Sequence, residues 1–112
     1  MLDQRLFDEI KLQLEDDILS FGWLRQLANT QNSERPESEC VDAVISTVLK
    51  LHSDRQIVIG NAYESDNTVL VSSWTETNDV LAAKMRSEII RLNGTDDQQF
   101  CFWIQSIVDF AG

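Results

Sequence analysis

Positive charge is scarce in this sequence, and the shortage excludes several kinds of ligand. Nine Lys and Arg residues stand against nineteen Asp and Glu, so the formal net charge is −10 and the sequence pI is near 4.3. Proteins that bind nucleic acids or anionic membranes need cations to neutralise phosphates, so we expect neither as a ligand. A strongly acidic surface either favours rapid encounter with a basic protein or only keeps a small protein soluble.

Residues that carry catalytic or metal chemistry are also few. The one histidine, His52, falls beside the apolar face of an expected helix, where it is predicted to pack rather than to act as a base or a ligand. Cys40 falls in the first turn of the same helix, which favours a thiolate, whereas Cys101 lies between two Phe residues, which favours inert packing. CxxC, HxxxH, Gly-rich phosphate-loop and GxSxG patterns are lacking. We therefore expect no catalytic residues, no metal and no cofactor, and leave open whether Cys40 or His52 has a chemical role.

The chain also lacks long apolar runs. No run approaches the roughly 20 residues that span a bilayer, and the N-terminus lacks the basic-then-apolar pattern of a signal peptide. A cytoplasmic protein is the resulting expectation. With 112 residues, 43% of them hydrophobic and 25% charged, we expect one acidic α+β domain over residues 1–112.

Hydrophobic spacing in the first half predicts three helices. Apolar residues recur every four positions and predict an amphipathic helix over residues 2–20, with the acidic side chains largely off its apolar stripe. A short second helix is predicted over residues 23–28. Pro36 suits the first turn of a third helix, whose apolar face continues to Leu49.

The second half predicts strands and one more helix. Two β-branched runs, residues 56–62 and 68–72, flank a polar turn and predict a β-hairpin. The capping-box spacing of Ser73 and Glu76 predicts that a fourth helix begins there, and residues 99–108 predict a last strand that can join the hairpin. The predicted fold is α+β, in the order α-α-α-β-β-α-β with a small antiparallel sheet. Three helices followed by a hairpin indicate a winged-helix-like arrangement.

Acidic residues concentrate around the predicted hairpin and before the last strand. If the hairpin tip and the strand entry meet, their carboxylates form one acidic patch. The residues predicted to contact a partner are Glu64, Asp66, Glu76, Asp79, Asp96 and Asp97.

Two other sets of residues bear on partner binding. The only net-positive stretch, residues 80–95, carries three cations, which are too few for a nucleic-acid footprint and are expected to pair with carboxylates. The three tryptophans, Trp23, Trp74 and Trp103, are expected in the core. An exposed one would be the best candidate for an anchor residue in a protein interface.

Scattered positions also form a recognisable pattern. It comprises a Trp on an early helix, a strand ending in Gly, a Trp at a helix entrance and a late aromatic strand: Trp23, Gln56-Ile57-Val58-Ile59-Gly60, Ser73-Trp74 and Phe102-Trp103-Ile104. This pattern, spanning residues 23–104, resembles small bacterial immunity proteins of winged-helix character, such as those of contact-dependent growth inhibition. The long first helix departs from it. The resemblance implies a cytoplasmic antitoxin that neutralises a toxin by tight one-to-one binding.

Charge and resemblance together predict an immunity protein, not an enzyme. It is expected to be a monomer, or one half of a 1:1 heterodimer, and to cover the active site or substrate cleft of a basic toxin domain, a nuclease. Alternatives are an acidic DNA mimic or anti-defence inhibitor, a winged-helix regulatory or interaction module, and, more remotely, an enzyme using Cys40 or His52. A DNA-binding module would need a basic third helix, yet that helix carries Glu37, Glu39 and Asp42 against Lys50.

Overall fold

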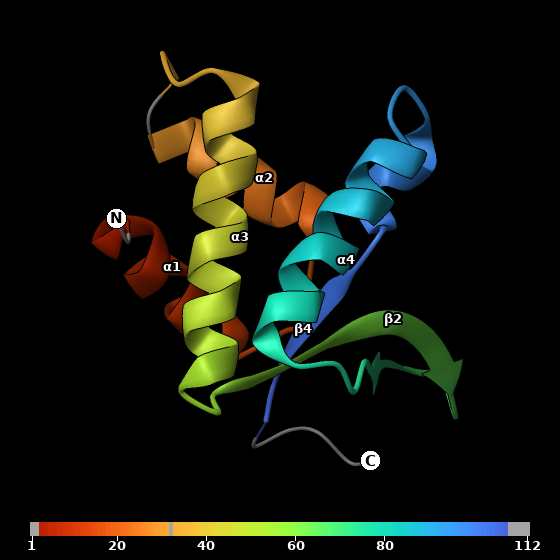
Figure 1. Ribbon diagram of the computed structural model, residues 1–112. Coiled ribbons are helices and arrows are strands. Elements are labelled where there is room, and N and C mark those ends of the chain that lie inside the picture. The colour runs from red at the N-terminus through yellow and green to blue at the C-terminus, as the bar shows by residue number, and fades with distance from the viewer. Residues whose placement is uncertain (1–2, 32, 108–112) are drawn as a thin grey trace.

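The protein combines four α-helices with one antiparallel sheet, which confirms the predicted α+β class (Figure 1). The computed structural model describes residues 3–31 and 33–107. The elements follow one another as α1 Gln4–Leu14, β1 Leu19–Ser20, α2 Phe21–Gln31, α3 Glu37–Ser53, β2 Ile57–Ser65, β3 Thr68–Ser73, α4 Asn78–Arg91, the 3-10 helix η1 Asp96–Phe100 and β4 Trp103–Ser106. No helix in the described part of the chain is long and apolar enough to cross a membrane.

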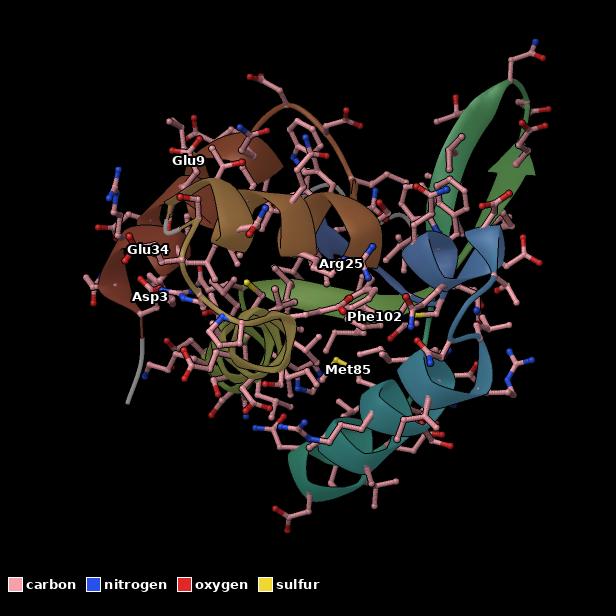
Figure 2. The ribbon with its side chains drawn as sticks, turned by 90° about the horizontal axis from the view of Figure 1, so that it is seen from above. Asp3, Glu9, Arg25, Glu34, Met85 and Phe102 are labelled. Atoms are coloured by element: carbon pink, nitrogen blue, oxygen red, sulfur yellow. The ribbon has the colours of Figure 1, made fainter. Side chains whose placement is uncertain are left out.

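The sheet joins three distant parts of the chain in the order β1-β4-β2-β3. Ile104 of β4 pairs with Leu19 of β1 on one side and with Ile59 of β2 on the other. The last strand therefore joins the hairpin, as predicted. Asp66 and Asn67 have positive φ angles of 50° and 66°. They form the two-residue turn at the tip of the β2–β3 hairpin, which extends away from the helices (Figure 2).

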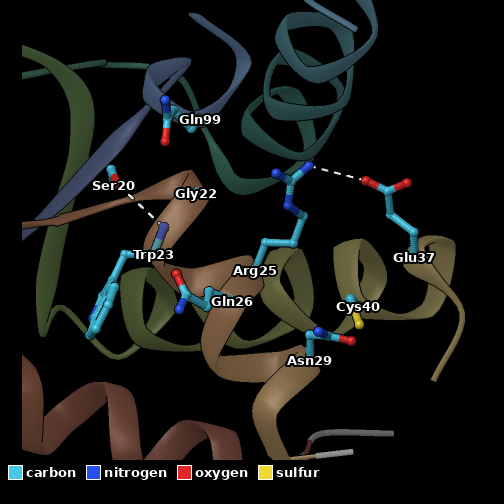
Figure 3. A pocket seen from close by; sticks show the side chains of 9 residues that line it. All are labelled: Ser20, Gly22, Trp23, Arg25, Gln26, Asn29, Glu37, Cys40 and Gln99. Atoms are coloured by element: carbon cyan, nitrogen blue, oxygen red, sulfur yellow. Dashed lines mark hydrogen bonds and ion pairs between the residues drawn. The ribbon is translucent and has the colours of Figure 1, made fainter. Parts of the chain in front are cut away.

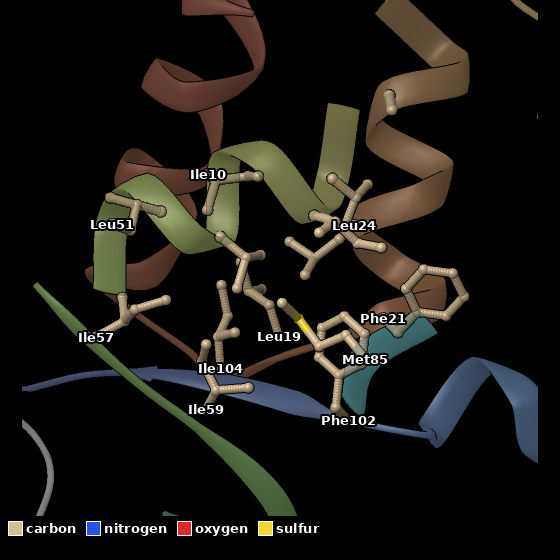
Figure 4. Packing of buried hydrophobic residues seen from close by; sticks show 14 of the residues in the cluster. Ile10, Leu19, Phe21, Leu24, Leu51, Ile57, Ile59, Met85, Phe102 and Ile104 are labelled. Carbon is tan, nitrogen blue, oxygen red and sulfur yellow. The ribbon is translucent and has the colours of Figure 1, made fainter. Parts of the chain in front are cut away.

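One hydrophobic core lies between the helices and the sheet (Figure 4). Each helix contributes the residues of one face, as Leu6, Ile10 and Leu14 do in α1. Phe102, which is fully buried, packs its ring 5.3 Å from that of Phe21 and 6.4 Å from that of Trp74, measured between centroids. Burying a side chain of this size contributes on the order of 2–3 kcal/mol, so Phe102 is a principal link between α2 and the sheet.

The first predicted helix is too long. α1 ends at Leu14, and the next apolar residues belong to β1 and α2 rather than to its stripe. Residues 19–20 pair with β4, and the Phe21 backbone N–H donates to the Phe102 carbonyl at 2.9 Å. These pairings are incompatible with a continuous helix. Phe21 therefore begins α2, which is longer than predicted.

The predicted capping box at Ser73 is also wrong. Ser73 is the last residue of β3, and the backbone N–H of Trp74 still donates to the Ile59 carbonyl at 2.7 Å. Because the chain remains paired with β2 there, a helix cannot begin. α4 starts at Asn78, with Thr77 as its N-cap.

The last strand is shorter than predicted. Residues 99 and 100 belong to η1, and β4 covers only Trp103–Ser106. The predicted end of this strand at Val108 lies outside the described residues. The predicted order of the major elements is otherwise observed, with β1 and η1 added.

Candidate interaction surface

The predicted contact residues fall into three separate pairs. Glu64 and Asp66 lie at the hairpin tip, Glu76 and Asp79 lie at the start of α4, and Asp96 and Asp97 lie in η1. α4 is 14 residues long and so separates the second and third pairs by about 20 Å. The hairpin tip also lies away from the segment that follows α4 (Figure 1). The pairs therefore do not form one patch, and their contact with a partner stays a prediction.

Glu76 is already engaged within the protein. Its carboxylate accepts a hydrogen bond from the Lys84 ammonium at 2.9 Å, and this bond lowers the pKa of Glu76. The same ammonium lies over the Trp74 ring, 4.4 Å from its centroid. Glu76 therefore ties the segment before α4 to the helix itself and is a weaker candidate for contact with a partner.

The hairpin pair has acidic neighbours that the sequence pattern did not reveal. The loop between α1 and β1, residues 15–17, lines a hollow of about 540 Å³ together with Asn67, Thr68 and Val69 of the hairpin. Glu64 is the cross-strand partner of Val69, so both side chains point to the same face of the hairpin. We call this site the acidic hollow. Glu15, Asp16 and Asp17 line it, and Glu64 and Asp66 lie next to it at the hairpin tip.

The cations of the protein do not neutralise the acidic hollow. Six of the nine Lys and Arg side chains form ion pairs elsewhere. They are Arg25, Arg35, Lys50, Lys84, Arg86 and Arg91. Among the described residues, none of these ion pairs involves a carboxylate of the acidic hollow. These carboxylates are therefore not held in ion pairs within the described part of the chain. Residues 3–31 and 33–107 also contain no cluster of His, Cys, Asp and Glu suited to a metal ion.

Two further hollows continue from the acidic hollow along the same surface. The middle one, of about 260 Å³, shares Asp17 and Ile18 with the acidic hollow and is also lined by Trp103. The last one, of about 540 Å³, shares Ser20 and Trp23 with the middle one (Figure 3). Because neighbouring hollows share lining residues, the three form one row, with Trp23 between the last two.

Trp23 is not in the core, contrary to the expectation from the sequence. Its side chain is 40% exposed, although it is one of the largest apolar groups in the chain. The indole Nε1–H donates to Gln13 Oε1 at 3.3 Å, and the Trp23 backbone N–H donates to Ser20 Oγ at 3.3 Å. Trp74, by contrast, packs against the core. Trp103, also expected in the core, is half-buried outside the core cluster and stacks on Phe100 at 5.7 Å between centroids. Trp23 thus exposes part of its indole between two hollows, with its Nε1–H hydrogen-bonded to Gln13.

Comparisons of this chain with protein-family models, curated proteins and solved structures give no match. The row of three hollows is the candidate interaction surface. That surface combines uncompensated carboxylates with an exposed tryptophan, which are features of protein-binding sites.

The candidate catalytic residues are not arranged for joint action. Cys40 and His52 lie 12 positions apart on α3, which places them about 18 Å apart along the helix. His52 Nδ1 lies 2.6 Å from Asn78 Oδ1 and so links the end of α3 to the start of α4. Burial raises the pKa of the Cys101 thiol to about 11, and the nearby Glu88 carboxylate acts in the same direction. The Cys101 thiol is therefore protonated at neutral pH, in keeping with the inert packing that its sequence neighbours predict.

Proposed function

We propose that this chain is an immunity protein that binds and neutralises a basic toxin domain of the nuclease class. In this proposal it is a cytoplasmic, non-enzymatic monomer that forms a 1:1 complex and covers the active site or substrate cleft of the toxin. The observation that carries the proposal is the acidic hollow, where the acidic loop of residues 15–17 faces the hairpin next to Glu64 and Asp66, and where no ion pair among the described residues involves these carboxylates.

The chemistry of the expected partner fits this surface. A nuclease must bind phosphates and therefore presents a cleft rich in Lys and Arg. Such a cleft is attracted to a surface of opposite charge, which raises the rate of encounter. The scaffold supports the proposal too: the observed succession of α1, α2 and α3 followed by the β2–β3 hairpin favours a winged-helix-like arrangement, with α4 and β4 as additions.

The proposal predicts that the protein captures one basic partner from its own host. Tagged protein is incubated with host lysate and washed at low and then at high salt. We expect recovery of one basic toxin-like domain at unit stoichiometry, released as the salt concentration rises because the attraction is electrostatic. Co-expression of this chain with that domain should then restore growth of otherwise inhibited cells.

Other outcomes would replace the proposal by a specific alternative. Recovery of a DNA-binding complex of a defence system would indicate a DNA mimic, and recovery of a host regulator would indicate an interaction module. A captured toxin domain that still inhibits growth in the presence of this chain would contradict neutralisation. Failure to capture any basic protein would leave the acidity as a solubility feature and end the immunity proposal.

A further inference from the structure

Trp23 differs from the other tryptophans in what surrounds its ring. The Trp74 indole donates to Asn61 Oδ1 and its ring lies under the Lys84 ammonium, so both its polar and its aromatic groups are used. Trp103 is half-buried and covered by Phe100. Trp23 keeps an exposed face while its indole is held by Gln13. A rigid, exposed aromatic ring loses little conformational entropy when a partner covers it.

Charged residues line the two hollows that contain Trp23. On one side, the middle hollow contains Asp17, which also lines the acidic hollow. On the other side, the last hollow contains Glu37, whose side chain is 74% exposed. The one cation lining that hollow, Arg25, forms an ion pair with Glu37 at 3.1 Å (Figure 3) and also donates to Gln98 Oε1 at 3.1 Å. The exposed part of Trp23 therefore shares a hollow with the carboxylate of Asp17, which forms no ion pair with another described residue, whereas Glu37 lies at the far end of the last hollow and is paired with Arg25.

We infer that Trp23 anchors a basic segment of the partner, with a Lys or Arg side chain of that segment lying over the exposed indole face. The inference rests on the proposed function, since it takes the partner to be a basic protein. The aliphatic stem of the partner's Lys or Arg side chain covers apolar surface of the Trp23 ring, and its charged end is attracted to the π system and to Asp17. The contact surface for the partner then extends from the acidic hollow along the row of hollows to Trp23, which the distribution of charged residues alone does not identify.

Titration with cationic peptides tests the inference without knowledge of the toxin. Octa-lysine and octa-arginine peptides are added to ¹⁵N-labelled protein at low salt, and the indole N–H signals are followed by NMR. We expect the Trp23 signal to shift with saturation and the Trp74 signal to stay in place. Trp23→Ala should weaken binding about tenfold, and Trp23→Phe should weaken it less, because phenyl rings bind cations more weakly than indole.

A matched variant separates a local contact from general attraction to an acidic protein. Tyr63 is 46% exposed on the hairpin and does not line the row of hollows that contains Trp23. Tyr63→Ala should change the affinity for the peptides less than twofold. Equal affinities of Trp23→Ala and the wild type, or equal shifts at Trp23 and Trp74, would overturn the inference. Thermal melting of each variant shows that the comparison is between folded proteins; Trp23→Ala and Tyr63→Ala should each lower the melting temperature, because more than half of either residue is covered.

The same variants distinguish failure of the inference from failure of the proposed function. A toxin domain captured equally well by Trp23→Ala and by the wild type would reject the anchor and keep the immunity proposal. Peptide binding at Trp23 without capture of any toxin domain would keep the anchor and reject the immunity proposal. If sedimentation instead showed a wild-type dimer that Trp23→Ala dissociates, the ring would be covered by a second copy of this chain, and the inference would be wrong.

Discussion

Gly60 leaves no room for a side chain in the sheet. It lies in β2 with Ser73 of β3 on one side and Trp103 of β4 on the other. A Cβ atom at this position would lie 1.7 Å from the carbonyl oxygen of Ser72. Because that oxygen belongs to the backbone, rotation of a side chain cannot relieve the clash, and the strand itself would have to move.

We therefore expect Gly60→Ala to lower the free energy of unfolding by about 3 kcal/mol. Gly94→Ala is the matched control, because Gly94 has a positive φ of 82° but no atom within 4 Å of an added Cβ. That variant should lose only about 1 kcal/mol, from left-handed backbone strain. Urea unfolding at neutral pH measures both values, and equal losses would show that the contact with Ser72 does not limit the site.

The exposure of Trp23 shows how residue-level predictions depend on helix boundaries. The buried face of α2 consists of Phe21, Leu24 and Ala28, which follow helical spacing. Once Phe21 is known to begin this helix, Trp23 falls off that face. The sequence pattern instead ended the first helix at residue 20 and began the second at residue 23, so the buried side of α2 could not be located. An incorrect boundary thus hid the best anchor candidate.

At the scale of elements, one ion pair connects the starts of two helices. The Asp3 carboxylate is the N-cap of α1 and accepts from the Leu6 backbone N–H at 3.1 Å and from the Arg35 guanidinium at 2.8 Å. Arg35 directly precedes Pro36, the N-cap of α3. Both side chains of the pair are largely buried, with 16% and 20% exposed. The pair therefore holds the start of α1 against the start of α3.

The stability contributed by Asp3 should depend on pH. Burial alone would raise the pKa of Asp3, but the hydrogen bonds from Arg35 and from the Leu6 amide outweigh it, so the pKa is lowered from 3.8. A group with a lowered pKa in the folded state stabilises the fold above its unfolded pKa and loses this contribution as the pH falls through the folded value. Because Asn caps a helix about as well as Asp does, Asp3→Asn mainly removes the charge pair with Arg35. It should therefore cost about 1 kcal/mol at pH 7, and the difference from wild type should shrink at strongly acidic pH.

Urea unfolding of both proteins between neutral and strongly acidic pH checks this expectation. Asp97→Asn is a suitable control, because Asp97 is exposed in η1 and forms no ion pair with another described residue. This control should match the wild type across the range. A cost of Asp3→Asn that is the same at every pH would show that the charge of Asp3 does not carry its contribution to stability.

Elements whose boundaries depend on neighbouring residues in the chain were predicted from sequence. Elements whose boundaries depend on pairing with a distant segment were not. The α3 start at Pro36 and the hairpin turn at Asp66-Asn67 depend on residues that are adjacent in the chain. β1 contains only two residues and exists because it pairs with β4 near the other end of the chain. The Ser73 capping pattern was overruled in the same way by pairing of Trp74 with Ile59. Local spacing carries no information on such contacts.

At the scale of the whole molecule, the sequence shows how much charge there is but not where it gathers. The net charge of −10 is read directly from composition. The acidic hollow, however, forms because β1 carries the loop of residues 15–17 to the sheet, where it faces the hairpin. Since β1 was not predicted, the sequence pattern found only the hairpin half of this site and added two pairs of carboxylates that lie elsewhere.

Charge reversal at three places tests which carboxylates guide the partner. Replacing two carboxylates by Lys adds four charges, so each variant has a net charge of −10 + 4 = −6. The double variants are Glu64→Lys with Asp66→Lys, Asp16→Lys with Asp17→Lys, and Asp96→Lys with Asp97→Lys. All six positions are exposed, so folding should be unaffected. Only the position of the changed charge then differs among the variants.

We expect both variants in the acidic hollow to slow association with the captured toxin domain about tenfold at low salt, because steering depends on the local potential. The η1 variant should slow it less than threefold, through the change in overall charge alone. Raising the salt concentration should bring the rates together, since it screens exposed charges. Stopped-flow mixing measures these rates. Equal rates for all three variants would remove the acidic hollow as the contact site, whereas a slower η1 variant would move the interface to Asp96 and Asp97.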